Sequence, residues 1–145
     1  MTHDYAEVGE YEVRISNDIS SLSCSNRRAD EYSDVYAPMI REVHTNATLL
    51  ESLLSTCFRN ARNMRVFTCR GASVRTIEAT TFGGCTALAG RLDFPCVYDV
   101  AETAFCDSPD VTELHFSAAN EAMIKSLPGY GTAFGAPNAE VFCDL

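Results

Sequence analysis

The stretch ATTFGGCTAL, at residues 79–88, places a phenylalanine six residues before a leucine, and this spacing recurs on both sides of it. Phe58 precedes Met64 and Phe105 precedes Val111 by the same interval. Phe58, Phe82 and Phe105 therefore recur at a nearly constant spacing along the chain. Self-similarity at a period in the twenties is the sequence signature of stacked repeats. We therefore expect repeated units, whose extended surfaces serve in binding.

A short apolar triplet follows each phenylalanine and predicts a strand. Triplets begin at residues 19, 40, 64, 88 and 111, and the copy at 88 carries one extra residue. Their later positions alternate with outward-facing residues, as side chains do in a strand. Apolar pairs also recur between the triplets, as Leu50 with Leu53, Val74 with Ile77, and Val97 with Val100. We expect the triplets to build a parallel sheet, and the phenylalanine segments to form turns or short helices on the opposite, convex side.

Two segments, ATTFGGCTAL and AETAFCDSPDVTELHF at residues 101–116, resemble leucine-rich repeats of the BspA type. That family occurs in bacterial surface proteins, some protist surface proteins and phage-encoded proteins. Its usual phrase is an Ala-Phe pair, a small residue and Cys, and then a Leu-rich strand. The matches are Ala104 with Phe105, and Cys85; the departures are Ser108 in place of Cys, and Thr81 and Cys57 in place of Ala.

The resemblance covers roughly residues 40–145 and implies an α/β solenoid. We expect a right-handed leucine-rich-repeat superhelix with a short-stranded parallel β-sheet and a C-terminal helix–strand cap. Residues 40–116 would form the repeats, and residues 117–145 the C-terminal cap that shields the end of the core. Residues 1–39 would be an N-terminal cap or a degenerate first repeat, with a separate docking arm as the alternative.

The cap sequence predicts a helix followed by a strand. Residues 117–127 favour a short helix with Met123, Ile124 and Leu127 facing inward, and with Ser117 or Asn120 as its N-cap. The turn residues at 128–131 end it. Residues 139–145 predict a final strand. At the other end of the chain, residues 11–15 alternate as a strand does, and residues 25–34 are polar enough for a loop.

Composition narrows the classes of partner. The chain has 145 residues and a net charge of −9. This charge argues against nucleic acid, which needs a basic footprint, and against charge-driven binding to anionic membranes. No apolar run approaches the roughly 18 residues of a membrane span. The first ten residues lack the basic and apolar regions of a signal peptide. The protein could thus work where it is made, be released by lysis, or be part of a longer secreted protein.

The seven cysteines follow the repeat, and their number is odd. We expect buried thiols that pack as small apolar groups, with disulfides as the alternative. No CxxC or HxxxH spacing points to zinc. We therefore expect no metal and no cofactor. The chain also has no GxSxG, HExxH or P-loop motif, so we expect no catalytic residues and no enzyme activity.

Residues between the triplet positions should form an exposed polar stripe on the sheet. The candidate ligand-binding residues in it are Glu42, His44, Thr68, Arg91, Asp93, Glu113 and His115. The stripe also includes Val66, Ser21 and Ser23. Rigid, quasi-linear faces of this kind bind extended partners. The alternative is a solvated face that is polar only because it meets water.

Two further groups are weaker candidates. Five arginines gather in one short stretch of an otherwise acidic chain: Arg59, Arg62, Arg65, Arg70 and Arg75. Arginines can hold carboxylates or sulfated sugars, although such residues are more often solvated or paired with nearby acids. Aromatic rings at Tyr98, Tyr130 and Phe134 could stack on sugars, but core or cap packing is the simpler interpretation.

These observations predict a non-enzymatic recognition or adhesion module that binds a protein or glycan at a cell surface. The setting could be a phage tail or receptor-binding component in a virion. The alternatives are a secreted bacterial surface adhesin domain and a structural assembly module of a larger complex. The chain could act alone, as a homo-oligomer or within a larger assembly.

Overall fold

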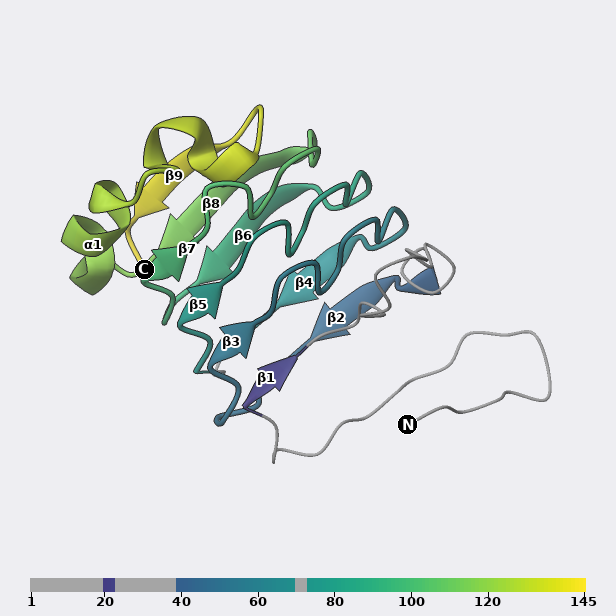
Figure 1. Ribbon diagram of the computed structural model, residues 1–145, viewed down its shortest axis with the longest axis horizontal. Coiled ribbons are helices and arrows are strands. Elements are labelled where there is room, and N and C mark those ends of the chain that lie inside the picture. Colours follow the sequence, from purple (N-terminus) through teal and green to yellow (C-terminus); the bar gives the residue numbers. More distant parts are fainter. Residues whose placement is uncertain (1–19, 23–38, 70–72) are drawn as a thin grey trace.

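Parallel strands dominate the computed structural model, which describes residues 20–22, 39–69 and 73–145 (Figure 1). The strand expected at residues 11–15, the loop at 25–34, and the positions of Ile19, Ser23, Cys24 and Arg70 lie outside the described residues. The described strands lie in two ladders along the length of the molecule, with the few helices at its C-terminal end (Figure 1).

The first ladder contains the strands that the triplets predict. Its members are β2 (Glu42–His44), β4 (Val66–Thr68), β6 (Gly90–Phe94), β8 (Val111–Phe116) and β9 (Glu140–Cys143). β2 pairs with β4, and β6, β8 and β9 form a three-stranded sheet, with every pairing parallel. Figure 1 places β6 next to β4, so the two sheets follow one another along one side. The expected parallel strands over residues 40–116 are confirmed.

A local irregularity marks the triplet with the extra residue. The register between β6 and β8 shifts between Gly90 and Arg91. Gly90 has φ of +75°, a left-handed conformation that glycine adopts without steric cost. Its amide donates to the Asp110 carbonyl at 2.8 Å. The extra residue is therefore absorbed at the start of the strand, and Leu92 and Phe94 still face the core.

The second ladder consists of two-residue strands that the sequence did not predict as strands. They are β1 (Ser21–Leu22), β3 (Ser52–Leu53), β5 (Thr76–Ile77) and β7 (Asp99–Val100), and they pair in parallel in that order. The apolar pairs between the triplets supply their buried residues, with Leu53, Ile77 and Val100 almost fully buried.

The first triplet was assigned wrongly. The sequence grouped Leu22 with the triplets and Ser21 with the exposed stripe of their sheet. In the structure, β1 belongs to the second ladder, where Ser21 pairs with Ser52 and Leu22 with Leu53. The stretch of chain from Leu22 to Leu53 is longer than the stretch from Leu53 to its next partner, Ile77. Counting back by one regular repeat length from the later triplets therefore places β1 in the wrong ladder.

The core is built on stacked aromatic rings. Phe58, Phe82 and Phe105 are almost fully buried, and their ring centroids lie 5.5 and 5.1 Å apart in succession. The segments that carry them are turns, as expected, and they bond to one another through the backbone. The Phe58 amide donates to Thr81, and the Phe82 amide donates to Ala104, each at 2.8 Å. Buried backbone groups in these turns thus find partners one repeat away.

The turns share a left-handed residue two positions after each phenylalanine. Asn60, Gly84 and Asp107 occupy this position, with φ of 61°, 70° and 57°. Glycine, asparagine and aspartate are the residue types that tolerate this conformation best. A Cβ added at Gly84 would lie 2.7 Å from the Asn60 side-chain oxygen, so the turn also packs closely against its neighbour.

The cysteine position of the repeat supplies a hydrogen-bond donor to the core. The Cys85 thiol donates to the Phe58 carbonyl at 3.2 Å, and the Ser108 hydroxyl donates to the Phe82 carbonyl at 2.7 Å. Ser108 can therefore replace Cys, because both side chains satisfy the carbonyl of the preceding repeat. Burial raises the pKa of Cys85 to about 12, and that of Cys69 likewise.

The expectation of buried thiols holds in part. Cys57, Cys69 and Cys85 are buried, whereas Cys96 is exposed and Cys106 and Cys143 are half-buried. All six of these described cysteines are free thiols.

The C-terminal segment folds as short helices and a strand. It contains the 3-10 helices η2 (Ala118–Asn120) and η3 (Tyr130–Gly135) and the α-helix α1 (Glu121–Ser126), and it ends in β9. The Ser117 hydroxyl caps η2 by accepting from the Ala119 amide at 3.3 Å. The final strand is confirmed, and it pairs in parallel with β8.

The predicted inward stripe of the helix is wrong at one position. Ile124 is fully buried and Leu127 is half-buried, but Met123 is 51% exposed. Asn120 occupies the N-cap position of α1, but its side chain makes no capping hydrogen bond and donates its amide to the Val97 carbonyl at 3.1 Å. Within the described ranges, no helix combines the length and apolar character needed to cross a bilayer.

Candidate functional site: the outer face of the first ladder

The predicted stripe lies on the outer face of the first ladder, where strand register arranges it in rows. One row aligns Arg91, Glu113 and Glu140 across β6, β8 and β9. The next row aligns Asp93, His115 and Phe142. On the neighbouring sheet, Glu42 pairs with Val66 and His44 with Thr68. We call these residues, together with Asp144 after β9, the outer face.

The β2–β4 part of the outer face is held by a central histidine. The Nδ1 atom of His44 lies 2.8 Å from the Thr68 hydroxyl, and its Nε2 atom lies 3.3 Å from a carboxylate oxygen of Glu42. The His44 and Glu42 side chains are more than half exposed. These three predicted residues therefore form one hydrogen-bonded and accessible group.

An ion pair occupies the middle of the outer face. The Nε atom of Arg91 donates to a carboxylate oxygen of Asp93 at 2.6 Å. The Arg91 side chain is 47% exposed and the Asp93 side chain is 19% exposed. The hydrogen bond to Asp93 raises the pKa of Arg91, so the guanidinium remains charged. Exposed pairs of this kind contribute little stability, so the pair serves mainly to fix the direction of the guanidinium.

His115 corrects the sequence prediction, because it is buried instead of exposed. Only 3% of the residue is accessible. Its Nε2 atom lies 2.8 Å from Glu113, and its Nδ1 atom lies 2.6 Å from Asp144. The Phe142 ring stacks on it, with centroids 4.6 Å apart and planes 12° apart. The alternation of side chains along β8 does turn His115 toward the outer face, as predicted, but β9 then covers it.

Three residues of the outer face were missed by the sequence analysis. Glu140, Phe142 and Asp144 join it only because β9 pairs with β8 in parallel. The available signal was the alternation within residues 139–145, which predicted the strand. That alternation carries no information on which strand β9 would pair with.

The outer face is acidic. Its carboxylates come from Glu42, Asp93, Glu113, Glu140 and Asp144, and the guanidinium of Arg91 is their counterpart. Because Arg91 already pairs with Asp93, much of the surrounding negative charge is left to face solvent. A surface of this sign attracts cationic groups and repels anionic ones.

The other candidates lie elsewhere. The described arginines of the cluster, Arg59, Arg62, Arg65 and Arg75, are all exposed. Arg75 lies 3.9 Å from Glu51, which agrees with ordinary pairing to a nearby acid. Phe134 is fully buried in the core, and Tyr98 and Tyr130 are half-buried. Among the described His, Cys, Asp and Glu residues, no group of three is placed to hold a metal ion.

No protein-family model matches this sequence, and no curated protein matches it either. The resemblance to BspA-type repeats therefore stays a prediction that rests on residues 79–88 and 101–116.

Proposed function

We propose that this chain is a BspA-type leucine-rich-repeat solenoid that acts as a non-enzymatic recognition module. The outer face of the first ladder would bind a protein or a glycan at a cell surface. The observation that carries the proposal is the ordered polar face itself. Its side chains stand in register on parallel strands and are already hydrogen-bonded to one another.

Pre-ordering favours binding because a free side chain loses rotamer entropy when a partner fixes it. His44 and Arg91 have already lost part of that freedom through their bonds to Thr68 and Asp93. Both still expose about half of their side chains or more. This combination of order and exposure supports a binding role for the outer face.

The charge of the outer face narrows the partner. Sulfated or sialylated glycans would meet carboxylates and are disfavoured. A basic protein surface or a neutral glycan fits better. A phage receptor-binding component and a secreted bacterial adhesin are two settings for this same binding role, and they differ in the cell that carries the partner.

The alternative role as an assembly module has one observation in its favour. β9 is the terminal strand of the β6-β8-β9 sheet. Terminal strands can pair with a strand from another chain. Four residues make a short edge, so such a contact would need further surface elsewhere.

Cell binding by a labelled protein tests the proposal. The protein would be incubated with a panel of bacteria and with mammalian epithelial cells, and bound label would be measured by flow cytometry. The test variant would carry Glu42→Gln, His44→Gln, Arg91→Gln and Asp93→Asn. His115 and Glu113 stay unchanged, because the His115 contacts hold β9 in place.

The matched control would carry Glu51→Gln, Arg62→Gln and Glu102→Gln. These residues are exposed and lie off the outer face, and the changes shift the net charge by the same +1 as the test variant. Binding to one class of cell that the test variant loses and the control keeps would support the proposal. Equal binding by both variants, or no binding to any cell, would overturn it.

A further inference from the structure

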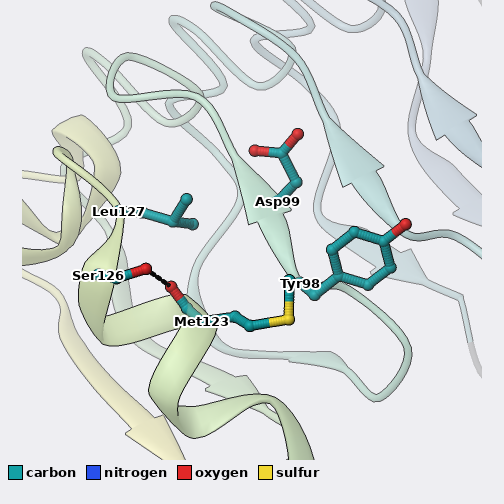
Figure 2. A pocket seen from close by; sticks show the side chains of 5 residues that line it. All are labelled: Tyr98, Asp99, Met123, Ser126 and Leu127. Atoms are coloured by element: carbon teal, nitrogen blue, oxygen red, sulfur yellow. Dashed lines mark hydrogen bonds between the residues drawn. The ribbon is translucent and has the colours of Figure 1, made fainter.

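A hollow of about 220 Å³ lies between the last strand of the second ladder and the cap helix. Figure 2 shows its five lining residues, Tyr98, Asp99, Met123, Ser126 and Leu127. The first two belong to β7 or adjoin it, and the others belong to α1 or its end. The hollow lies apart from the outer face, on the other ladder of strands (Figure 1).

The hollow arises where the stacking of short strands ends. β7 is the last member of the β1-β3-β5-β7 sheet, and the next pass of the chain presents α1 in place of a further strand. Asn120 ties the start of this helix to the Val97 carbonyl. A six-residue helix cannot follow the edge of a strand as another strand would, so space remains between the two.

Met123 and Leu127 give the hollow an apolar wall on the side of α1. Met123 reaches from α1 toward the strand that carries Tyr98 (Figure 2), and it remains 51% exposed. Leu127 and Tyr98 are half-buried. Met123 and Leu127 together form an apolar surface suited to an aliphatic chain.

The polar groups of the hollow differ in their availability. The Ser126 hydroxyl donates to the Met123 carbonyl at 2.7 Å, which is a local bond within the helix. Asp99 is exposed at the rim. A sugar needs several convergent hydrogen-bonding groups. With the serine committed to the backbone, the hollow offers chiefly a carboxylate beside apolar walls.

We propose that this hollow binds a lysine or arginine side chain of a partner protein. The aliphatic stem would lie over Met123 and Leu127, and the charged end would pair with Asp99. The net charge of −9 adds a long-range attraction for basic partners.

This site goes beyond the proposed role of the outer face, and its test does not depend on it. Amide chemical shifts of the 15N-labelled protein would be followed during titration with N-acetyl-arginine amide, N-acetyl-lysine amide and methyl glucoside. We expect the two cations to shift the amides around Tyr98, Met123 and Leu127. We expect methyl glucoside to leave them unchanged, and sodium chloride to weaken the response.

Two variants locate the contact. Asp99→Asn keeps the size of the side chain and should weaken arginine binding about three- to fivefold. Asp110→Asn removes another exposed carboxylate, from a turn outside the hollow, and should leave binding unchanged. The spectrum of each variant also reports whether it is folded. Equal binding by wild type and Asp99→Asn, a response to methyl glucoside alone, or no shifts near the hollow would overturn the proposal.

Discussion

Replacing Phe82 with alanine should remove a large part of the stability of this protein. Phe82 is fully buried at the centre of the repeats. Its ring centroid lies between 4.8 and 6.3 Å from those of four other rings: Phe58, Phe67, Phe94 and Phe105. Among the described rings, only Phe94 has as many aromatic neighbours. Truncation of Phe82 therefore opens a cavity lined by aromatic side chains.

The size of the effect follows from the lost burial and the cavity. Truncating a buried phenylalanine to alanine costs about 3–5 kcal/mol. A domain of this kind has about 5–15 kcal/mol of total stability, so the variant would be marginal. Phe82→Leu keeps most of the volume and should cost about 1–2 kcal/mol. Phe142→Ala makes the same chemical change at a half-buried ring stacked on His115, and should cost about 1 kcal/mol.

Urea unfolding followed by far-ultraviolet circular dichroism would measure these differences, since the chain has no tryptophan to report by fluorescence. The wild type and the three variants would be compared at one pH and salt concentration. A loss of less than about 1 kcal/mol for Phe82→Ala, or an equal loss for Phe142→Ala, would refute the idea that the ring stack carries the core.

Two further predictions concern single side chains. The pKa of Cys85 is raised to about 12 by burial, whereas an unfolded thiol ionises near 9, so thiolate forms first in the unfolded chain. The free energy of unfolding should therefore fall as pH rises from about 9 to about 12. In Cys85→Ser the fall should be shallower by about 1.4 kcal/mol per pH unit, measured by urea unfolding at several pH values; parallel curves would contradict this. His115→Ala should speed amide hydrogen exchange in β9 about tenfold, because both carboxylate contacts and the Phe142 stack are lost, whereas His44→Ala should not. Equal exchange in the two histidine variants would show that His115 does not hold β9.

The sequence predicts the first ladder well because its triplets alternate in a way that only strands satisfy. Val43, Phe67, Leu92 and Leu114 all lie in parallel strands as expected. The second ladder was not predicted as strands, because two residues are too few to show alternation. Its apolar pairs were recognised as recurring columns, but columns of that length are equally compatible with turns.

The candidate site shows what local patterns omit. Alternation correctly turned His44, Arg91 and His115 away from the core. Burial of His115 depends on β9, which follows the C-terminal helices and returns to pair with β8 through tertiary structure. No pattern within residues 111–116 carries that information. Likewise, the exposure of Met123 follows from how α1 meets β7, and helical periodicity does not describe that contact.

The register of the outer face sets the dimensions that a partner has to match. Neighbouring parallel strands lie about 4.8 Å apart, and side chains on one side of a strand repeat every ~6.6 Å. The rows of Arg91 and Asp93 thus define a rectangular grid of side-chain positions with those two spacings. The groups of a rigid partner that contact this face would have to repeat at the same two spacings, one across the strands and one along them. Duplication of one repeat would lengthen the grid by one column and leave its spacing unchanged.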